Sequence, residues 1–379
     1  MNNRLCKQLG IPFPLFAFSH CRDVVVAVSK AGGFGVLGAA NFTPEQLETE
    51  LAWIDAHIEG HPYGVDLLFP ENMSLAGEDP SKVGDLMRNI PDRHVRFVAG
   101  LLQQHGLDAG DDADVRARFV AQPPSLLRAQ GLRLLDVAFR HPIKLIVNAL
   151  GLPPPEMFEG ARKHGVLVGA LAGSREHALR HVEAGVDVIV AQGGEAGGHC
   201  GEVSTIVLVP EVVRAVRKIK DVPVLAAGGI MTGRQMAAAV ALGAAGAWTG
   251  SVWLATTESE TSQTFREKMV AARSRDTVRS KGRTGKYSRQ LRSAWTQAWE
   301  GPDSPGALPM PLQSMVSEPA LQRASDAADK GHPGARELVT YFVGQGVGLV
   351  ESVRSARSVV QEFREDFAEA VGDIEAFMA

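Results

Sequence analysis

The sequence predicts an α/β protein built on a closed (β/α)8 barrel, the TIM-barrel architecture, with a second, smaller and mostly helical domain. Short apolar runs alternate along the chain with amphipathic stretches, and this alternation is typical of parallel strands joined by helices. Eight such runs can be counted, which is the number that a closed barrel requires. The length of 379 residues exceeds that of a usual single hydrophobic core, so an additional domain is expected.

The eight expected strands alternate with helices that carry start and stop signals. Thr43 can cap a helix, and Gln46 can complete a capping box with it. The stretches 174–185 and 232–243 each begin with a capping residue and end with a glycine, so we expect a helix in each. The strands are placed near residues 13–18, 35–39, 63–68, 143–148, 166–171, 187–191, 222–226 and 246–251.

Two segments interrupt the regular alternation and define the expected domains. Residues 70–140 form a long excursion that prolines and glycines break into short helices. We therefore expect a barrel over residues 1–252, including this excursion, and a small helical domain on the substrate side over residues 253–345. Residues 346–379 are predicted to form a C-terminal helix that packs back on the barrel, because apolar residues recur from Val350 onward at helical spacing.

Composition excludes several classes of function. Hydrophobic residues make up 45% and charged residues 22% of the chain, and the formal net charge is -4. These values are ordinary for a globular protein. They give no excess of positive charge that would indicate binding to nucleic acid or to an anionic membrane. The cysteines Cys6, Cys21 and Cys200 form neither a disulfide framework nor a metal motif. No apolar run is long enough to span a membrane or direct export, so a cytoplasmic location is expected.

Two glycine sites at consecutive strand ends suggest an anion site. Gly228 and Gly229 follow the seventh strand and precede a helix that Thr232 caps, while Gly250 and Ser251 end the eighth strand. Glycine lets backbone N–H groups approach a phosphate closely, and a helix N-terminus adds partial positive charge. Either site alone is as readily explained by a tight turn. Together they favour phosphate, because loops seven and eight form the usual phosphate clamp of such barrels.

A second constellation, Gln192 to Gly201, follows the sixth strand. It contains four glycines ahead of His199, so its backbone can pass close to a flat ligand. A histidine at this rim can accept a proton from carbon or hold an anionic substrate. The alternative is a structural role, in which His199 only forms hydrogen bonds within the glycine loop. The surrounding glycines and the position at a strand end favour the functional interpretation.

Residues 191–201, 223–230 and 248–259 resemble the signature stretches of the nitronate monooxygenase family, formerly called 2-nitropropane dioxygenases, and residues 31–38 resemble it as well. The resemblance implies FMN and no nicotinamide cofactor. It also implies oxidation of nitronates or nitroalkanes by dioxygen to a carbonyl compound and nitrite. His199 falls on the catalytic histidine of the family.

The resemblance also assigns the residues that contact FMN. Three of them border the flavin and four hold its phosphate. The border residues are Gln192, Gly197 and Gly198, and the phosphate residues are Gly228, Gly229, Gly250 and Ser251.

Two positions depart from the family pattern. The turn Ala17 to His20 replaces the usual turn of the first strand, so flavin contacts there are open. Asp66 follows a Gly-Val pair after which many members place asparagine, and we expect this acidic residue near the flavin or its phosphate. His20 adds a second titratable group at the barrel mouth or is a loop histidine without function.

Three hypotheses follow. The first is an FMN-dependent nitronate monooxygenase, and the alternative is an FMN-dependent enoyl-thioester reductase that uses NADH or NADPH. The third is a flavin-binding protein without turnover. The expected partners are a small-molecule substrate and dioxygen, with a homodimer left open. The basic run 273–292 contacts a phosphorylated substrate or is a solvated loop.

Overall fold

The computed structural model describes residues 3–40, 42–69, 89–108 and 128–379. Its centre is a closed barrel of eight parallel strands, as predicted, and each strand lies within two residues of its expected place. The barrel strands, in order, are β1 (Leu15–Ser19), β2 (Phe34–Gly38), β3 (Tyr63–Leu67), β4 (Leu145–Asn148), β5 (Leu167–Ala172), β6 (Val188–Gln192), β8 (Val224–Ala227) and β9 (Gly246–Thr249). The pairing of β9 with β1 closes the ring.

Alternate residues of each strand face the barrel interior, because side chains alternate between the two faces of a strand. The interior cluster includes Phe16, Val36 and Trp248, and helix α1 (Arg4–Leu9) closes the amino end of the barrel with Leu5 and Leu9. In β3 the outward residues Val65 and Leu67 pack under the helices. Asp66, between them, therefore points into the barrel.

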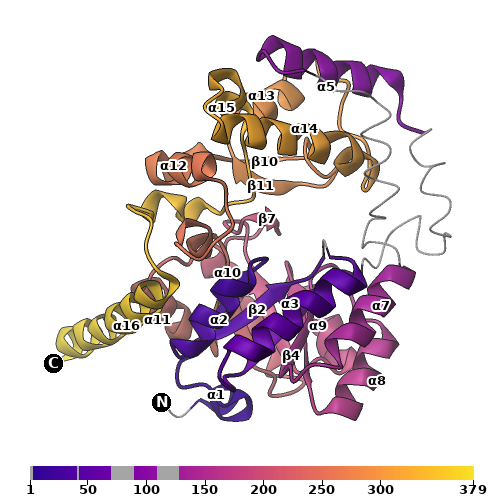
Figure 1. The fold of residues 1–379 in the computed structure, drawn as a ribbon. Coiled ribbons are helices and arrows are strands. Elements are labelled where there is room, and N and C mark those ends of the chain that lie inside the picture. Colours follow the sequence, from indigo (N-terminus) through magenta and orange to yellow (C-terminus); the bar gives the residue numbers. More distant parts are fainter. Residues whose placement is uncertain (1–2, 41, 70–88, 109–127) are drawn as a thin grey trace.

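Helices cover the outside of the barrel (Figure 1). Three of them begin as predicted, with side-chain caps from Thr43, Ser174 and Thr232, and Thr43 forms the expected capping box with Gln46. The surrounding helices are α2 (Arg22–Lys30), α3 (Pro44–His57), α7 (Arg128–Ala138), α8 (Pro155–His164), α9 (Arg175–Ala184), α10 (Thr205–Val216) and α11 (Gly233–Ala241).

A second group of elements lies beyond one end of the barrel, at the top of Figure 1. It contains α12 (Gln263–Ala271), α13 (Ala294–Glu300), α14 (Leu312–Asp329) and α15 (Pro333–Leu338). These helices accompany a small antiparallel sheet in the order β10 (Thr277–Ser280), β11 (Ser288–Leu291) and β7 (Gly198–His199).

The excursion after β3 contributes to this second group. Helix α5 (Asp92–Gln104) packs against α14, and Phe97 contacts Trp299 edge to face. Residues 70–88 and 109–127 of the excursion lie outside the described residues, so the short helices expected there stay predictions.

The C-terminal helix begins later than its apolar spacing suggests. Helix α16 runs over Ala356–Met378, and the Ser355 side chain caps it by accepting a hydrogen bond from Ser358 N–H. Val350 and Val353 lie before it, because residue 354 pairs in an extended bridge with Thr256. Helix α16 packs against α11 and α2. None of the helices in the described part of the chain has the length and apolar character needed to cross a membrane.

Candidate active site

The predicted site residues gather at the carboxyl end of the barrel. Asp66 lies in β3, Gln192 ends β6, and the glycine pair follows β8. Because the strands are parallel, these ends meet at one rim. The loop after β6 reaches the turn after β8, because a Cβ on Gly228 would lie 3.2 Å from the carbonyl oxygen of Gly193 and 3.3 Å from the backbone nitrogen of Ala196.

Both glycines of the pair after β8 adopt left-handed backbone conformations. The φ angle is 111° at Gly228 and 73° at Gly229. A Cβ on Gly228 would lie 2.6 Å from the Thr205 hydroxyl oxygen. Only glycine fits this turn without strain, and the turn leads within a few residues into the capped N-terminus of α11. The local geometry is thus that of a βα turn able to expose N–H groups to an anion.

Ser251 faces the same region from the end of β9. Its hydroxyl oxygen accepts a hydrogen bond from the backbone N–H of Gly344 at 2.8 Å. A hydroxyl that accepts one bond still has its own proton to donate, so Ser251 remains able to bind a phosphate oxygen. Gly250 leaves open space beside it, because a Cβ there would meet only Phe18, at 3.9 Å.

The glycine loop after β6 packs closely on a distant part of the chain. A Cβ on Gly197 would lie 2.8 Å from the backbone carbon of Val343, and Gly198 has a φ of 75°. The carboxylate of Glu195 accepts hydrogen bonds from the N–H and hydroxyl of Thr205, the first residue of α10. The loop is therefore held against both α10 and the segment around Val343.

His199 belongs to the small sheet rather than to the barrel. It pairs with Ser288 of β11, while Gly198 pairs with Arg289. The side chain of Arg289 donates to the carbonyl of Gly194 at 2.9 Å. The histidine thus sits where the loop after β6 joins the second group of elements.

The imidazole of His199 is half-buried and is held by two neighbours. Its Nε2 lies 2.8 Å from the hydroxyl oxygen of Thr284, and its ring lies 6.2 Å from the ring of Phe342. Burial, together with the positive charge of Lys286, lowers the pKa of His199 to about 4. The ring is therefore uncharged at neutral pH and can accept a proton.

Asp66 is a buried carboxyl group inside the barrel. It is 3% exposed, and its Oδ2 has no hydrogen-bond partner among the described residues. Burial raises the pKa of Asp66 well above its ordinary value, so the group is protonated over a wider pH range than a surface aspartate. A buried polar atom without a partner is costly, and a ligand at the barrel mouth would supply one.

The atypical turn after β1 is packed against β2. The Nδ1 of His20 lies 2.7 Å from the carbonyl oxygen of Gly38, so Nδ1 carries the proton that it donates. Burial lowers the pKa of His20, and Phe18 contacts the ring edge to face. His20 is therefore a neutral, hydrogen-bonded residue at the mouth.

Two parts of this region were not predicted from the sequence. Thr284 lies in the hairpin between β10 and β11, and nothing near it in the sequence indicated a contact with His199. The segment Phe342 to Gly346 passes between the loops after β6, β8 and β9, where Gly344 and Gly346 allow close backbone approach. The glycines at 344, 346 and 348 were a sequence signal for such an approach.

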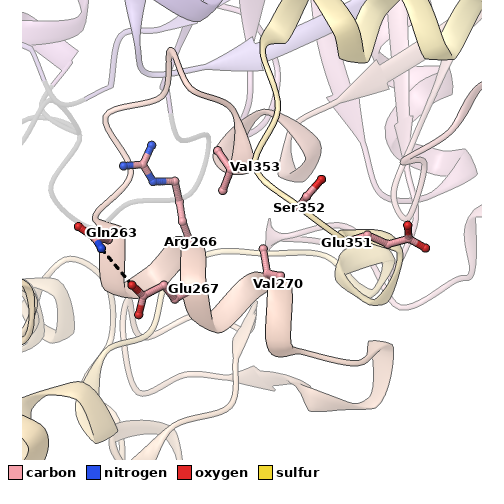
Figure 2. A pocket seen from close by; sticks show the side chains of 7 residues that line it. All are labelled: Gln263, Arg266, Glu267, Val270, Glu351, Ser352 and Val353. Atoms are coloured by element: carbon pink, nitrogen blue, oxygen red, sulfur yellow. Dashed lines mark hydrogen bonds between the residues drawn. The ribbon is translucent and has the colours of Figure 1, made fainter.

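A separate hollow of about 600 Å³ lies between α12 and the chain leading to α16. Figure 2 shows its lining, which includes Arg266, Glu267 and Val353. None of the predicted site residues lines it, so it is distinct from the barrel mouth.

The barrel with its glycine-rich rim, taken together with the family that its sequence matches, identifies a flavin-dependent oxidoreductase. More particularly, the chain belongs to the nitronate monooxygenase family, whose model matches residues 11–366. Membership of this family indicates an enzyme that acts on a small-molecule substrate with oxygen. The hypothesis of a flavin-binding protein without turnover is therefore not retained.

Known relatives agree with this assignment. A Mycobacterium tuberculosis protein assigned as a monooxygenase, Rv1533, is 54% identical over 382 residues, which cover 100% of both chains. A Staphylococcus aureus protein assigned as a nitronate monooxygenase is 28% identical over 364 residues, covering 92% of each chain.

Solved structures share the fold. Nitroalkane oxidase from Streptomyces ansochromogenes superposes with a TM-score of 0.77 at 24% identity, covering 98% of this chain and 99% of the other. FabK from Thermotoga maritima gives a TM-score of 0.70 at 24% identity, covering 100% and 99%. At these identities the likeness concerns the fold alone.

Proposed function

We propose that this protein is an FMN-dependent nitronate monooxygenase, which oxidises alkyl nitronates or nitroalkanes with dioxygen to a carbonyl compound and nitrite. The observation that carries the proposal is the neutral imidazole of His199, held by Thr284 beside the glycine-rich rim. The family membership supports a flavin as the cofactor, and in this proposal the flavin binds at that rim.

The residues present fit a phosphate-bearing flavin. Gly228 and Gly229 offer backbone N–H groups ahead of α11, and Ser251 has a hydroxyl proton to donate. In this proposal Gly250 completes the phosphate site, while Gln192, Gly197 and Gly198 border the flavin. The bound flavin supplies the electron transfer to dioxygen, and the protein positions it.

Asp66 fits this cofactor in its protonated form. A neutral carboxyl group offers one donor and one acceptor, as the amide of asparagine does. A carboxylate there would instead repel the phosphate. The raised pKa of Asp66 therefore makes an aspartate compatible with a position at which an anionic cofactor binds.

His199 has the proposed role of base. A neutral imidazole accepts the proton that leaves the carbon next to the nitro group of a nitroalkane, which yields a nitronate and an imidazolium. With a nitronate as substrate that step is already complete, so no base is needed for it. Replacement of His199 by Asn should therefore reduce turnover of nitroalkanes more than turnover of nitronates.

Purified protein tests this proposal. Its visible spectrum and the nucleotide released on denaturation distinguish FMN from FAD and from no flavin. Oxygen uptake and nitrite release with short-chain nitronates are then measured without nicotinamide. Protein that carries FMN but consumes no oxygen with any nitronate would contradict the proposed activity.

A second candidate is an FMN-dependent enoyl-thioester reductase, and one observation favours it. Tyr287 is 51% exposed, with Arg279 and Lys281 placed 5.4 and 4.7 Å from its ring centre. An exposed aromatic ring beside two cations suits the phosphates and base of a nucleotide-bearing thioester or of NADPH. Rapid anaerobic bleaching of the flavin by NADPH, with no nitronate activity, would favour this function.

We also propose that residues 253–345 form a substrate-side domain above the barrel of residues 1–252, with residues 346–379 as a returning helix. The pairing of His199 with β11 supports this division, because it ties the second domain directly to the barrel mouth.

A further inference from the structure

The hydroxyl group of Thr284 has three neighbours that form hydrogen bonds. Its Oγ1 lies 2.8 Å from Nε2 of His199, 3.1 Å from the carbonyl oxygen of Lys286 and 3.4 Å from the backbone nitrogen of Lys286. A hydroxyl group has one proton to donate and can accept two. The carbonyl of Lys286 can only accept and its N–H can only donate, so the roles of these two neighbours are fixed.

We propose that Thr284 is a positioning residue that holds His199 in the tautomer protonated at Nε2, which leaves Nδ1 as the nitrogen that exchanges a proton with the substrate. This inference rests on the proposed role of His199 as base. Thr284 donates its proton to the carbonyl of Lys286 and accepts from Lys286 N–H and from Nε2–H of His199.

The opposite arrangement leaves a bond unmade. If Thr284 donated its proton to Nε2, the carbonyl of Lys286 would lose its bond from the hydroxyl. The arrangement with a protonated Nε2 uses the one donor and both acceptor positions of the hydroxyl. A neutral imidazole has one donor and one acceptor nitrogen, so fixing the proton on Nε2 fixes the lone pair on Nδ1. Within the described residues, the ring makes no hydrogen bond through Nδ1.

The loop that carries Thr284 is held rigidly on both sides. The buried guanidinium of Arg283 donates two hydrogen bonds of 2.8 Å to Glu318 and one of 3.1 Å to the carbonyl of Thr340. The carbonyl of Gly282 accepts from Trp295 Nε1 and from the amide of Gln313. The position of the Thr284 hydroxyl is therefore set by the small domain, independently of the barrel.

The next residue fixes the loop from the other side. Gly285 has a φ of 85°, and a Cβ there would lie 2.2 Å from the carbonyl oxygen of Leu308. No other residue fits without displacing that backbone. Because the loop is fixed before any ligand binds, Thr284 selects one tautomer of His199 rather than adapting to either.

The test is a ¹⁵N NMR measurement of the imidazole nitrogens at neutral pH, with the histidine resonances assigned by comparison with His199→Asn. The expected spectrum shows a protonated Nε2 and an unprotonated Nδ1 for His199. A protonated Nδ1 with an unprotonated Nε2 overturns the inference. Neither outcome depends on turnover, so failure of the proposed activity and failure of this inference are separate results.

Two substitutions test the positioning role. Thr284→Val keeps the shape but removes the hydroxyl, and we expect the tautomers to mix and kcat for a nitroalkane to fall about 5- to 10-fold, as for loss of one hydrogen bond. Thr284→Ser should restore both the spectrum and the rate. Thr49→Val, which removes a surface hydroxyl bonded to the Glu45 carbonyl on α3, is the matched control. An unchanged tautomer in Thr284→Val overturns the positioning role, and circular dichroism confirms that each variant is folded.

Discussion

Nε2 of His199 and the hydroxyl oxygen of Thr284 lie 2.8 Å apart although 85 residues separate them in the sequence. The first follows a barrel strand, and the second lies in a hairpin of the small sheet. The hydrogen bond therefore joins the barrel rim to the small sheet, two parts of the chain that are distant in the sequence. The proposed base acts only when both parts are assembled, so mutations in either one affect the same catalytic group.

Replacing Gly229 by alanine should weaken flavin binding. The left-handed φ of 73° strains any residue with a Cβ, at a cost of about 1 kcal/mol. The Cβ would also lie 3.2 Å from that of Glu195. We expect a roughly 5-fold rise in the flavin dissociation constant, because each 1.4 kcal/mol is a factor of about ten. Fluorescence titration of the apoprotein measures it.

Gly165→Ala is the control for that change. Gly165 ends α8 with a φ of 66°, and a Cβ there would meet nothing within 4 Å. Its backbone strain is comparable, yet it lies away from the barrel rim. Equal loss of flavin affinity in the two variants would show that the effect is general destabilisation rather than a phosphate site at Gly229.

Asp66→Asn should stabilise the flavin-free protein at neutral and alkaline pH. Burial raises the pKa of Asp66 in the folded state, so the folded protein keeps a proton that the unfolded chain releases. The free energy of unfolding is then highest below the ordinary pKa of an aspartate. It falls as the pH rises towards the pKa that Asp66 has in the folded state. Asparagine removes this dependence. Thermal unfolding at several pH values should show a gain in Tm that grows with pH.

The matched control for this change is Asp303→Asn, which replaces an exposed aspartate in a loop of the second domain. It should leave Tm unchanged at every pH. A gain in the Asp66 variant that is equally large at acidic pH would contradict the ionisation argument and indicate a packing effect.

Lys286→Met should raise the pKa of His199. The positive charge of Lys286 helps to lower that pKa to about 4 in the native protein. The native rate with a nitroalkane should therefore be flat across neutral pH and fall only as the pH approaches 4. In the variant this fall should begin at higher pH. The shift should shrink in high salt, because Lys286 is exposed and its charge is screened.

A matched change at Lys163→Met, at the end of α8, should leave the pH profile unchanged. If the two lysine variants shifted the profile equally, overall charge rather than proximity to His199 would be responsible.

Glu318→Gln should destabilise the second domain and slow turnover together. Arg283 is buried and donates two hydrogen bonds to Glu318. Removing the carboxylate leaves a buried cation with a weaker acceptor, at a cost of about 2 kcal/mol. Urea unfolding measures the loss. Glu351→Gln, an exposed residue beside the hollow in Figure 2, is the control. A stable Glu318 variant would show that the ion pair contributes little.

The barrel could be predicted because its signals are local. Each strand is a short apolar run, and the caps at Thr43, Ser174 and Thr232 lie within three residues of the groups that they bond. The glycine turns after β6 and β8 were equally visible. Since parallel strands end at one rim, their order in the chain was enough to bring those turns together.

The neighbours of His199 could not be predicted in the same way. Thr284 reaches it only because β11 pairs with the two-residue strand β7, and a strand so short has no periodicity to detect. The late start of α16 has a similar cause. Val350 and Val353 match the helical spacing, but the bridge between Thr256 and Arg354 holds that stretch extended.

Helix α16 also bears on the order of events during synthesis. It lies across α11 and α2, and Phe367 packs edge to face on Phe13 near the start of the chain. At the usual rate of translation, on the order of tens of seconds separate the emergence of Phe13 from that of Phe367. The seam where β9 meets β1 thus lacks its covering helix until residues 356–378 have been synthesised. A nascent chain must keep this apolar surface from aggregating throughout that interval.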